Sequence, residues 1–149
     1  PKLMKTIKKL ICLLFCILSL FACSKEESNP QYDPSNVLFK DIPISAIKSC
    51  VIGHWIPFRQ YGGVAGITEL KDIYEEYQEN ALIIENRATN DYTRIEIKKW
   101  IKQDDACILI GTDNTPILYM YGIKKDILST SMGKEPSPDN IVTLSSRTK

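Results

Sequence analysis

Residues 106–123 have the sequence ACILIGTDNTPILYMYGI, in which two short apolar runs flank the polar segment 112–116. Apolar runs bounded by Thr, Asp, Asn and Pro are typical of strands joined by a turn. The connection is too short for the crossover that parallel strands need. We therefore predict an antiparallel pair of strands at this point of the chain.

The same alternation of apolar runs and polar turns extends in both directions. The expected strands are 55–61, 81–85, 93–102, 106–110, 117–123, 127–132 and 141–145. Pro57 indicates an edge or bulged strand, and Trp100-Ile101 break the alternation, which predicts a bulge or twist. The sequence thus predicts a mainly β domain, an antiparallel up-and-down meander that forms a closed barrel, an open barrel or a sandwich.

One segment inside this domain has a different period. Apolar residues of the segment from Thr68 to Gln78 fall at helical spacing, with acidic residues and a lysine on the other side. This pattern predicts one short amphipathic helix. The alternative is that Tyr74 to Tyr77 begin a strand that runs into Ala81.

Residues 1–22 have the layout of a secretory signal peptide. Lysines precede an apolar run, residues 10–22, that only Ser19 interrupts. The run is about 13 residues long, whereas a membrane-spanning helix needs about 20. We therefore favour a signal helix over a transmembrane anchor. We interpret residues 1–3, which precede Met4, as an artefact outside the natural chain.

The segment Leu20-Phe21-Ala22-Cys23 resembles the lipobox of bacterial lipoproteins. In that family the cysteine is diacylglycerylated, the signal is removed before it, and the new amino terminus is acylated. The resemblance implies lipidation of Cys23, with the membrane as a partner. Residues 23–44 would then be a flexible tether rich in Ser, Asn and Pro, and residues 45–149 the folded domain.

The residues after the lipobox bear on the location of the protein. Ser24-Lys25-Glu26-Glu27 resembles the acidic export signal of surface-displayed lipoproteins in some Gram-negative bacteria. It implies a lipid anchor in the outer membrane with the domain on the cell surface, and the periplasmic face is the alternative. Without residues 1–22 the chain keeps 15 basic and 18 acidic residues. Because acidic residues outnumber basic ones in such a chain, it lacks the positive charge that binds phosphate groups, and we expect no nucleic-acid partner.

Gly53-His54-Trp55 opens the first expected strand, and Arg147 closes the last one. A Gly-x-Trp and a late arginine resemble the pattern of lipocalins and of small bacterial lipocalin-like lipoproteins. The resemblance implies an eight-stranded barrel, one strand more than the seven expected here. Trp55 would plug its closed end, with Arg147 across the indole in a cation–π contact of about 0.5 to 2 kcal/mol. The alternative is a plain core tryptophan and a solvated arginine.

A small barrel of this kind is just wide enough to hold a small ligand. Tyr119 and Tyr121 share one face of their strand, and with Trp100 they are the candidate ligand-lining residues. Leu118 and Met120 make the opposite face apolar too, so we expect this strand to be buried on both sides. The alternative is that the tyrosines are core residues whose hydroxyls bond the backbone.

Catalytic and metal-binding patterns are missing from the sequence, so we predict neither an enzyme nor a cofactor or metal. His54 is the one imidazole, no nucleophile or phosphate-loop motif is present, and there is no Cys-x-x-Cys. We interpret Asp104-Asp105 and Asp113-Asn114 as residues that favour turns. The alternative is that they form a weak calcium site. Cys50 and Cys107 form a disulfide or remain two buried thiols.

Two classes of function remain. The first is a lipid-anchored envelope protein whose small barrel binds an apolar or amphipathic ligand. The second is an accessory or inhibitory lipoprotein that acts through contacts with another envelope protein and has no ligand pocket. An apolar cavity favours the first class, whereas a filled interior with an exposed apolar patch favours the second.

Overall fold

The computed structural model describes residues 32–64, 66–134 and 140–148. The signal peptide, Cys23 and the export signal therefore lie outside the described residues. Within the described ranges, no helix is long and apolar enough to cross a membrane.

Strands dominate this part of the chain. In order, the elements are β1 (Asn36–Leu38), the 3-10 helix η1 (Phe39–Asp41), α2 (Ile44–Val51), β2 (Gly53–Tyr61), β3 (Ile67–Glu69), β4 (Ile73–Tyr77), β5 (Ala81–Asn86), β6 (Asp91–Gln103), β7 (Ala106–Gly111), β8 (Pro116–Lys124), β9 (Ile127–Ser131) and β10 (Val142–Arg147). All seven expected strands are present, with bounds that shift by no more than a few residues.

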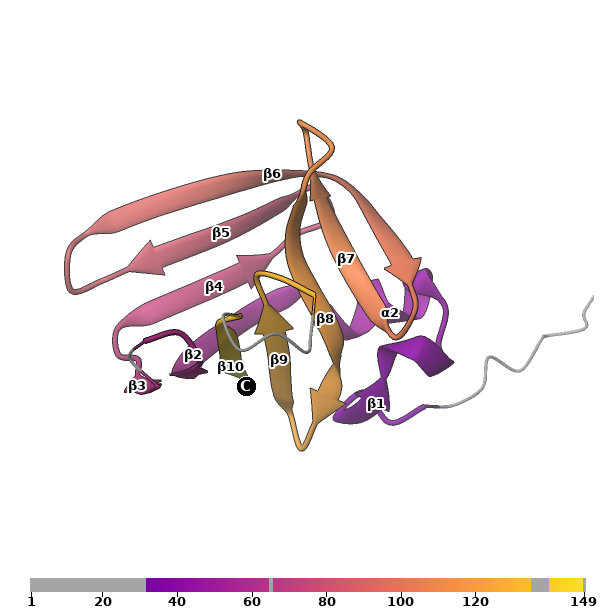
Figure 1. Ribbon diagram of the computed structural model, residues 1–149, viewed down its shortest axis with the longest axis horizontal. Coiled ribbons are helices and arrows are strands. Elements are labelled where there is room, and N and C mark those ends of the chain that lie inside the picture. The colour runs from indigo at the N-terminus through magenta and orange to yellow at the C-terminus, as the bar shows by residue number, and fades with distance from the viewer. Residues whose placement is uncertain (1–31, 65, 135–139, 149) are drawn as a thin grey trace, which may run out of the picture. The chain divides into compact units, whose positions relative to one another are not determined.

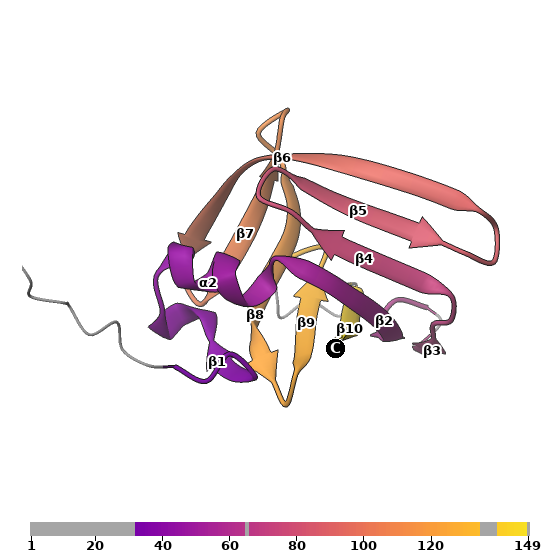
Figure 2. The ribbon, with the colours of Figure 1, turned by 180° about the vertical axis from the view of Figure 1, so that it is seen from behind.

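Eight of the described strands, β2 and β4 to β10, form a closed antiparallel barrel (Figures 1 and 2). Each pairs with the next along the chain, and β10 pairs with both β9 and β2. The closing register runs from Val142 opposite Tyr61 to Arg147 opposite Trp55. The predicted up-and-down meander is therefore confirmed, and of the predicted forms the closed barrel is the one observed.

The two remaining strands lie outside this ring. β3 pairs with the end of β2, and β1 pairs with the end of β8. The second pairing is close, because a Cβ atom on Gly122 would lie only 2.5 Å from the carbonyl oxygen of Val37. Any side chain at Gly122 would therefore push β1 away from the barrel.

The predicted helix from Thr68 to Gln78 is wrong. Its residues form the end of β3, a turn at Asp72 with a positive φ of 59°, and the strand β4. β4 pairs with β2 and β5, and this pairing outweighs the local helical period. β4 is also the eighth strand that the sequence count lacked. The alternative strand at Tyr74–Tyr77 was nearer the truth, although β4 ends before a separate strand begins at Ala81.

Among the described residues the one α-helix is α2, which lies where the sequence predicted the end of the tether. Ala46, Ile47, Cys50 and Val51 form its buried side. Figure 2 shows α2 leading directly into β2.

Residues before α2 are folded as well. Phe39 is completely buried, and Val37 and Ile42 are buried beside it. All three belong to the core cluster that contains Trp55. The folded domain thus includes residues 32–44, so the expected tether boundary at residue 44 is wrong.

The described ladder has four register shifts, and two of them concern the strands in which the sequence predicted a bulge. Ser145 lies opposite Pro57 and Leu144 opposite Arg59, so β2 has an extra residue directly after Pro57. On the other side of β2, β4 pairs with Gly53 to Trp55 and β3 pairs with Arg59 to Tyr61. Pro57 therefore lies at the bulge and in the gap between these two partners. The bulge in β6 is at Lys98, between Ile97 and Lys99, which is two residues earlier than predicted.

Cys50 and Cys107 are free thiols, and both are buried. Burial is the main cause that raises the pKa of Cys50. It also raises the pKa of Cys107 to about 11. Of the two arrangements considered for this pair, the structure has the two buried thiols.

We therefore expect Cys107 to be unreactive in the native protein. At about pH 8 a pKa of about 11 leaves on the order of 100-fold less thiolate than an ordinary cysteine has. Iodoacetamide labelling, followed by mass spectrometry of the Cys107 peptide, should be slow in buffer and fast in urea. Equal labelling rates in the two conditions would contradict the buried position.

Candidate functional site

The first candidate residues lie where the barrel closes. Trp55 is 1% exposed, and its indole Nε1 donates a hydrogen bond to the carbonyl oxygen of Val51 at 2.8 Å. The guanidinium carbon of Arg147 lies 4.7 Å from the centre of the Trp55 ring. Arg147 Nη2 also donates to the carbonyl oxygen of Cys50 at 2.8 Å. This is the arrangement that the lipocalin resemblance implied for the pair.

These contacts join three parts of the chain. Trp55 belongs to the first barrel strand, Arg147 to the last, and the two carbonyl acceptors belong to α2. The pair therefore attaches the helix to the seam between β2 and β10. Its role is structural, because the indole is almost completely covered.

Trp55→Ala should lower the free energy of unfolding by about 3 to 5 kcal/mol, the usual cost of emptying a large buried site. Urea denaturation measures this loss. Tyr92→Ala is the matched control, because Tyr92 is 65% exposed and should change stability by less than about 0.5 kcal/mol. A loss under about 1 kcal/mol for Trp55→Ala would show that the indole does not fill the closed end of the barrel.

A polar cluster lies inside the barrel. Glu75 Oε2 accepts hydrogen bonds from the Tyr77 hydroxyl at 3.2 Å and from Ser145 Oγ at 3.3 Å. The Tyr77 hydroxyl also contacts the Thr130 side chain. Tyr77, Thr130 and Ser145 are each at most 2% exposed. The cluster therefore connects β4, β9 and β10 through the interior.

The interior environment disfavours negative charge on these groups. Burial raises the pKa of the Glu75 carboxyl, and the hydrogen bonds from Tyr77 and Ser145 offset only part of the rise. Burial is also the main cause that raises the pKa of Tyr77, and the nearby Glu75 adds to it. Glu75 is therefore a carboxyl group that costs stability when it ionises.

The sign of this effect can be tested with Glu75→Gln. Because the pKa of Glu75 is higher in the folded than in the unfolded chain, the folded chain binds more protons between the two values. Protonated Glu75 therefore contributes fully to stability below the pKa that the carboxyl has in the unfolded chain, about 4.3. This contribution declines as the pH rises toward the pKa of Glu75 in the folded chain. Urea denaturation at a series of pH values should show Glu75→Gln gaining stability relative to wild type from about pH 4 upward.

Glu76→Gln provides the matched control for this series. Glu76 is on the opposite face of β4 and pairs across the sheet with His54 and Ile83. Its substitution should give no such gain with pH. A parallel gain in both variants would show that the effect does not come from the interior.

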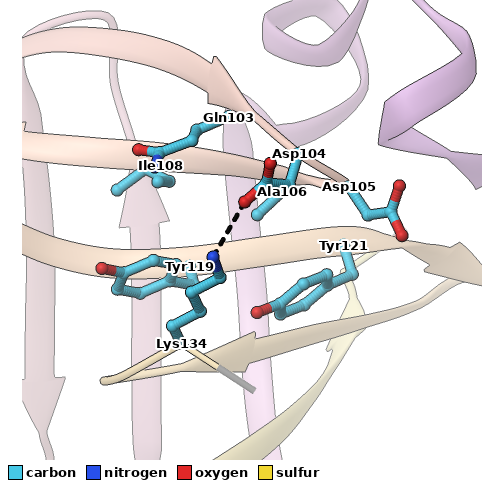
Figure 3. Close-up of a pocket in the computed structure, with 8 residues that line it drawn as sticks. All are labelled: Gln103, Asp104, Asp105, Ala106, Ile108, Tyr119, Tyr121 and Lys134. Carbon is cyan, nitrogen blue, oxygen red and sulfur yellow. Dashed lines mark hydrogen bonds and ion pairs between the residues drawn. The ribbon is translucent and has the colours of Figure 1, made fainter. Parts of the chain in front are cut away.

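The second candidate region is a pocket on the outer face of the barrel (Figure 3). Its volume is about 180 Å³. The lining residues come from the β6–β7 hairpin, from β8 and from the segment after β9, namely Gln103, Asp104, Asp105, Ala106, Ile108, Tyr119, Tyr121 and Lys134. Sequence reasoning thus found two lining residues, Tyr119 and Tyr121, but placed them in the barrel interior.

The alternation along β8 explains why the tyrosines face outward. Leu118 and Met120 belong to the interior core, whereas Tyr119 and Tyr121 pack against a second cluster formed by Ala106, Ile108 and Ile110. Tyr119 lies directly across from Ile108 in the ladder. Strand β8 thus has an apolar outer face that is only partly covered.

A charged rim borders this apolar surface. Lys134 Nζ lies 2.8 Å from Asp104 Oδ2, as the dashed line in Figure 3 marks. Both side chains are more than half exposed. Asp104 occupies a turn position with a positive φ of 52°. Asp104 is therefore a turn residue, as the sequence predicted, and also part of the pocket rim.

Trp100 is separate from this pocket. Its ring is 6% exposed in the interior core, and Nε1 donates to the carbonyl oxygen of Glu79 at 2.9 Å. Lys48 Nζ lies 5.8 Å from the ring centre, and Lys48 also forms an ion pair with Glu79. The structure thus divides the three predicted ligand-lining residues between the outer pocket and the core.

Sequence reasoning missed two residues of interest. Glu75 was placed on a solvated helix face, and only the period-2 order Ile73, Glu75, Tyr77 could have indicated its inward position. Lys134 carries no sequence signal.

Across the described ranges, no group of three or more His, Cys, Asp or Glu side chains could hold a metal ion.

Comparison with known proteins gives no match, whether with protein-family models, with curated proteins or with solved structures. The class of protein therefore rests on the fold itself. It is a small, closed, eight-stranded up-and-down β-barrel, which is compatible with a lipocalin-like barrel.

Proposed function

We propose that this protein is a binding module that holds a small, ring-containing amphipathic ligand in the outer pocket. The observation that carries the proposal is the combination of two tyrosines and an apolar floor with a charged rim. Ala106 and Ile108 form the floor, and each is at most 5% exposed. An amphipathic molecule has the matching division into apolar and polar parts.

The volume of the pocket limits the size of the ligand. An apolar protein cavity of about 150 Å³ accommodates benzene. A volume of about 180 Å³ therefore suits one six-membered ring with small substituents. The ring would pack against Tyr119 and Tyr121, because aromatic side chains favour stacked and edge-to-face contacts.

The rim residues would orient the polar part of the ligand. Asp104 and Lys134 already pair with each other at 2.8 Å in the exposed rim, where ion pairs contribute little stability. A ligand group can therefore replace one partner at low cost. Gln103 adds an amide that donates and accepts hydrogen bonds.

The proposal includes an envelope location. The lipobox-like segment supports a lipid anchor on Cys23, and the acidic residues after it support the outer face of the outer membrane, with the periplasmic face as the alternative. The pocket would then collect its ligand at the membrane surface.

A second candidate function is docking on another envelope protein. The β2–β3 hairpin carries exposed apolar side chains, since Val64 is fully exposed and Ile67 is 66% exposed. Two neighbouring exposed aliphatic residues suit a small protein contact. Val64→Ser with Ile67→Ser would abolish docking in co-purification from detergent-solubilised envelopes and leave the outer pocket unaffected.

The ligand proposal is testable with ring fragments. Phenol and cyclohexanol, titrated in the millimolar range, should shift amide NMR signals at residues 103–108 and 119–121. Tyr119→Ala should weaken binding about 10-fold by removing one aromatic wall. Tyr92→Ala, which removes an exposed tyrosine elsewhere on the barrel, should leave binding unchanged. Shifts confined to other regions, or none at all, would refute the pocket as the binding site.

The anchor is testable in cells of a bacterium that lipidates its own lipoproteins. Cys23→Ala should remove incorporation of labelled palmitate and release the processed chain from the membrane fraction. Cys50→Ala is the control, because Cys50 is a buried thiol of the domain. Full membrane retention of Cys23→Ala would overturn the lipid anchor.

A further inference from the structure

A second pocket lies on the outer face of the barrel, over the neighbouring strands β2, β4, β5 and β6. Its volume is about 200 Å³, and it shares no lining residue with the outer pocket. The lining on this face consists of His54 and of two tyrosines, two glutamates, an isoleucine and an arginine, namely Tyr74, Tyr92, Glu76, Glu85, Ile83 and Arg87. We call this depression the β4–β5 pocket.

The register of the sheet places these side chains next to one another. Glu76 on β4 is directly opposite Ile83 on β5. Glu85 lies opposite Tyr74 on one side and Tyr92 on the other. Along β4 and β5 they alternate with residues of the interior core, so they point outward, where Tyr92 is exposed and the other four are half-buried. Two carboxylates are therefore held beside two aromatic rings.

Arg87 shows which chemical group this surface accepts. Its guanidinium carbon lies 3.6 Å from the centre of the Tyr74 ring, and its Nε lies 3.2 Å from Glu85 Oε1. A planar guanidinium suits such a place, because it stacks on aromatic rings and donates hydrogen bonds to carboxylates. The chain thus holds one guanidinium of its own on the Tyr74 side of the pocket.

The charges of the lining glutamates and arginine do not cancel. Glu76 and Glu85 supply two carboxylates, whereas Arg87 supplies one guanidinium. Glu76 takes part in none of the ion pairs of the described residues. Its Oε1 accepts a hydrogen bond from the neutral amide of Gln78 at 2.9 Å. The pocket therefore has one carboxylate in excess, which favours a cationic ligand group.

Arg94 is a nearby cation whose charge is already balanced. It lies opposite Ile83 in the ladder, and it is not one of the lining residues of the pocket. Its Nε pairs with Glu96 at 2.7 Å, and its guanidinium also contacts the Tyr92 side chain. Because Glu96 balances Arg94, the excess carboxylate of the β4–β5 pocket remains.

We propose that the β4–β5 pocket receives an arginine side chain of a partner protein. The incoming guanidinium would bridge Glu76 and Glu85 over Ile83, with the two tyrosine rings on either side. These glutamates are diagonal neighbours on adjacent strands, about 7 to 8 Å apart between backbones, a span that a guanidinium with five N–H donors can bridge. An ionised carboxylate has about four acceptor positions, so Glu85 can bind Arg87 and the incoming arginine together.

Charge and shape select an arginine of a protein over other ligands. An anionic group would meet the excess carboxylate. Lysine has a compact ammonium, which neither stacks on a ring nor binds carboxylates in a planar fork. A free guanidinium ion would gain little, because single ion pairs at the surface contribute little stability. An arginine in a protein chain adds contacts of its alkyl stem with Ile83 and contacts of the residues on either side.

The test titrates the full chain with two blocked tripeptides, acetyl-glycyl-arginyl-glycine amide and the same peptide with citrulline in place of arginine. Citrulline keeps the shape of arginine and removes its charge. The titration is run in the millimolar range at about pH 8, where histidine is ordinarily uncharged. The arginine peptide should shift the amide NMR signals of Tyr74, Glu76, Ile83 and Glu85. It should bind at least about 5-fold more tightly than the citrulline peptide.

Two substitutions in the pocket should act in opposite directions. Glu76→Gln should weaken binding of the arginine peptide to the level of the citrulline peptide, because it removes the excess carboxylate. Arg87→Gln should tighten binding at least about 3-fold, because it removes a like charge and leaves Tyr74 and Glu85 to the incoming guanidinium. A gain in affinity cannot come from misfolding, so this variant keeps the test valid.

The ion pair of Arg59 with Glu69 provides matched controls. The two side chains lie 2.7 Å apart on β2 and β3, and neither lines the β4–β5 pocket. Arg59→Gln and Glu69→Gln change the net charge of the chain as Arg87→Gln and Glu76→Gln do. Both controls should leave binding of the arginine peptide unchanged, and equal effects in pocket and control variants would overturn the proposal.

Further outcomes would also refute this site. Equal binding of the arginine and citrulline peptides, or an Arg87→Gln variant that binds no more tightly than wild type, would overturn the proposal. Methylguanidinium, which lacks the stem and the flanking residues, should bind more weakly than the arginine peptide. If it bound equally well, the site would serve a small guanidinium compound, and the partner protein would be refuted. Phenol and cyclohexanol probe the outer pocket separately, so the two proposals can fail independently.

Discussion

The closure of the barrel between β2 and β10 is the constraint on which the other features depend. An open sheet would leave two edges of unpaired backbone groups, whereas closure pairs both of them. It also gives every strand one inner and one outer face, which fixes whether a side chain enters the core or meets solvent. Trp55, Arg147 and the carbonyl oxygens of α2 hold the closing seam at one end.

Closure also creates two chemically different environments within a few residues of each other. On β8, Met120 is in the interior, while Tyr119 and Tyr121 face the outer pocket. On β4, Glu75 is inside and Glu76 outside. A carboxyl group on the inner face loses water and its pKa rises. The same residue type one position later stays in contact with solvent.

The errors of sequence reasoning have a common cause. Residues of β4 fit a helical period by chance, and only pairing with β2 and β5 decides that they form a strand. The polar composition before Ile44 suggested a tether, although Phe39 and Ile42 had the apolar character to enter the core. Both errors concern segments whose structure depends on partners distant in sequence, which local patterns do not contain.

By itself the amino-acid sequence determined the β class, the up-and-down order and most strand bounds, because these follow from period-2 runs and short polar turns between neighbours. It also marked Trp55 and Arg147 as a pair through a family resemblance. Only the tertiary structure decided that the barrel closes, that Tyr119 and Tyr121 line an outer pocket, and that Glu75 faces the interior. The direction of a side chain depends on register, and register is set by long-range pairing.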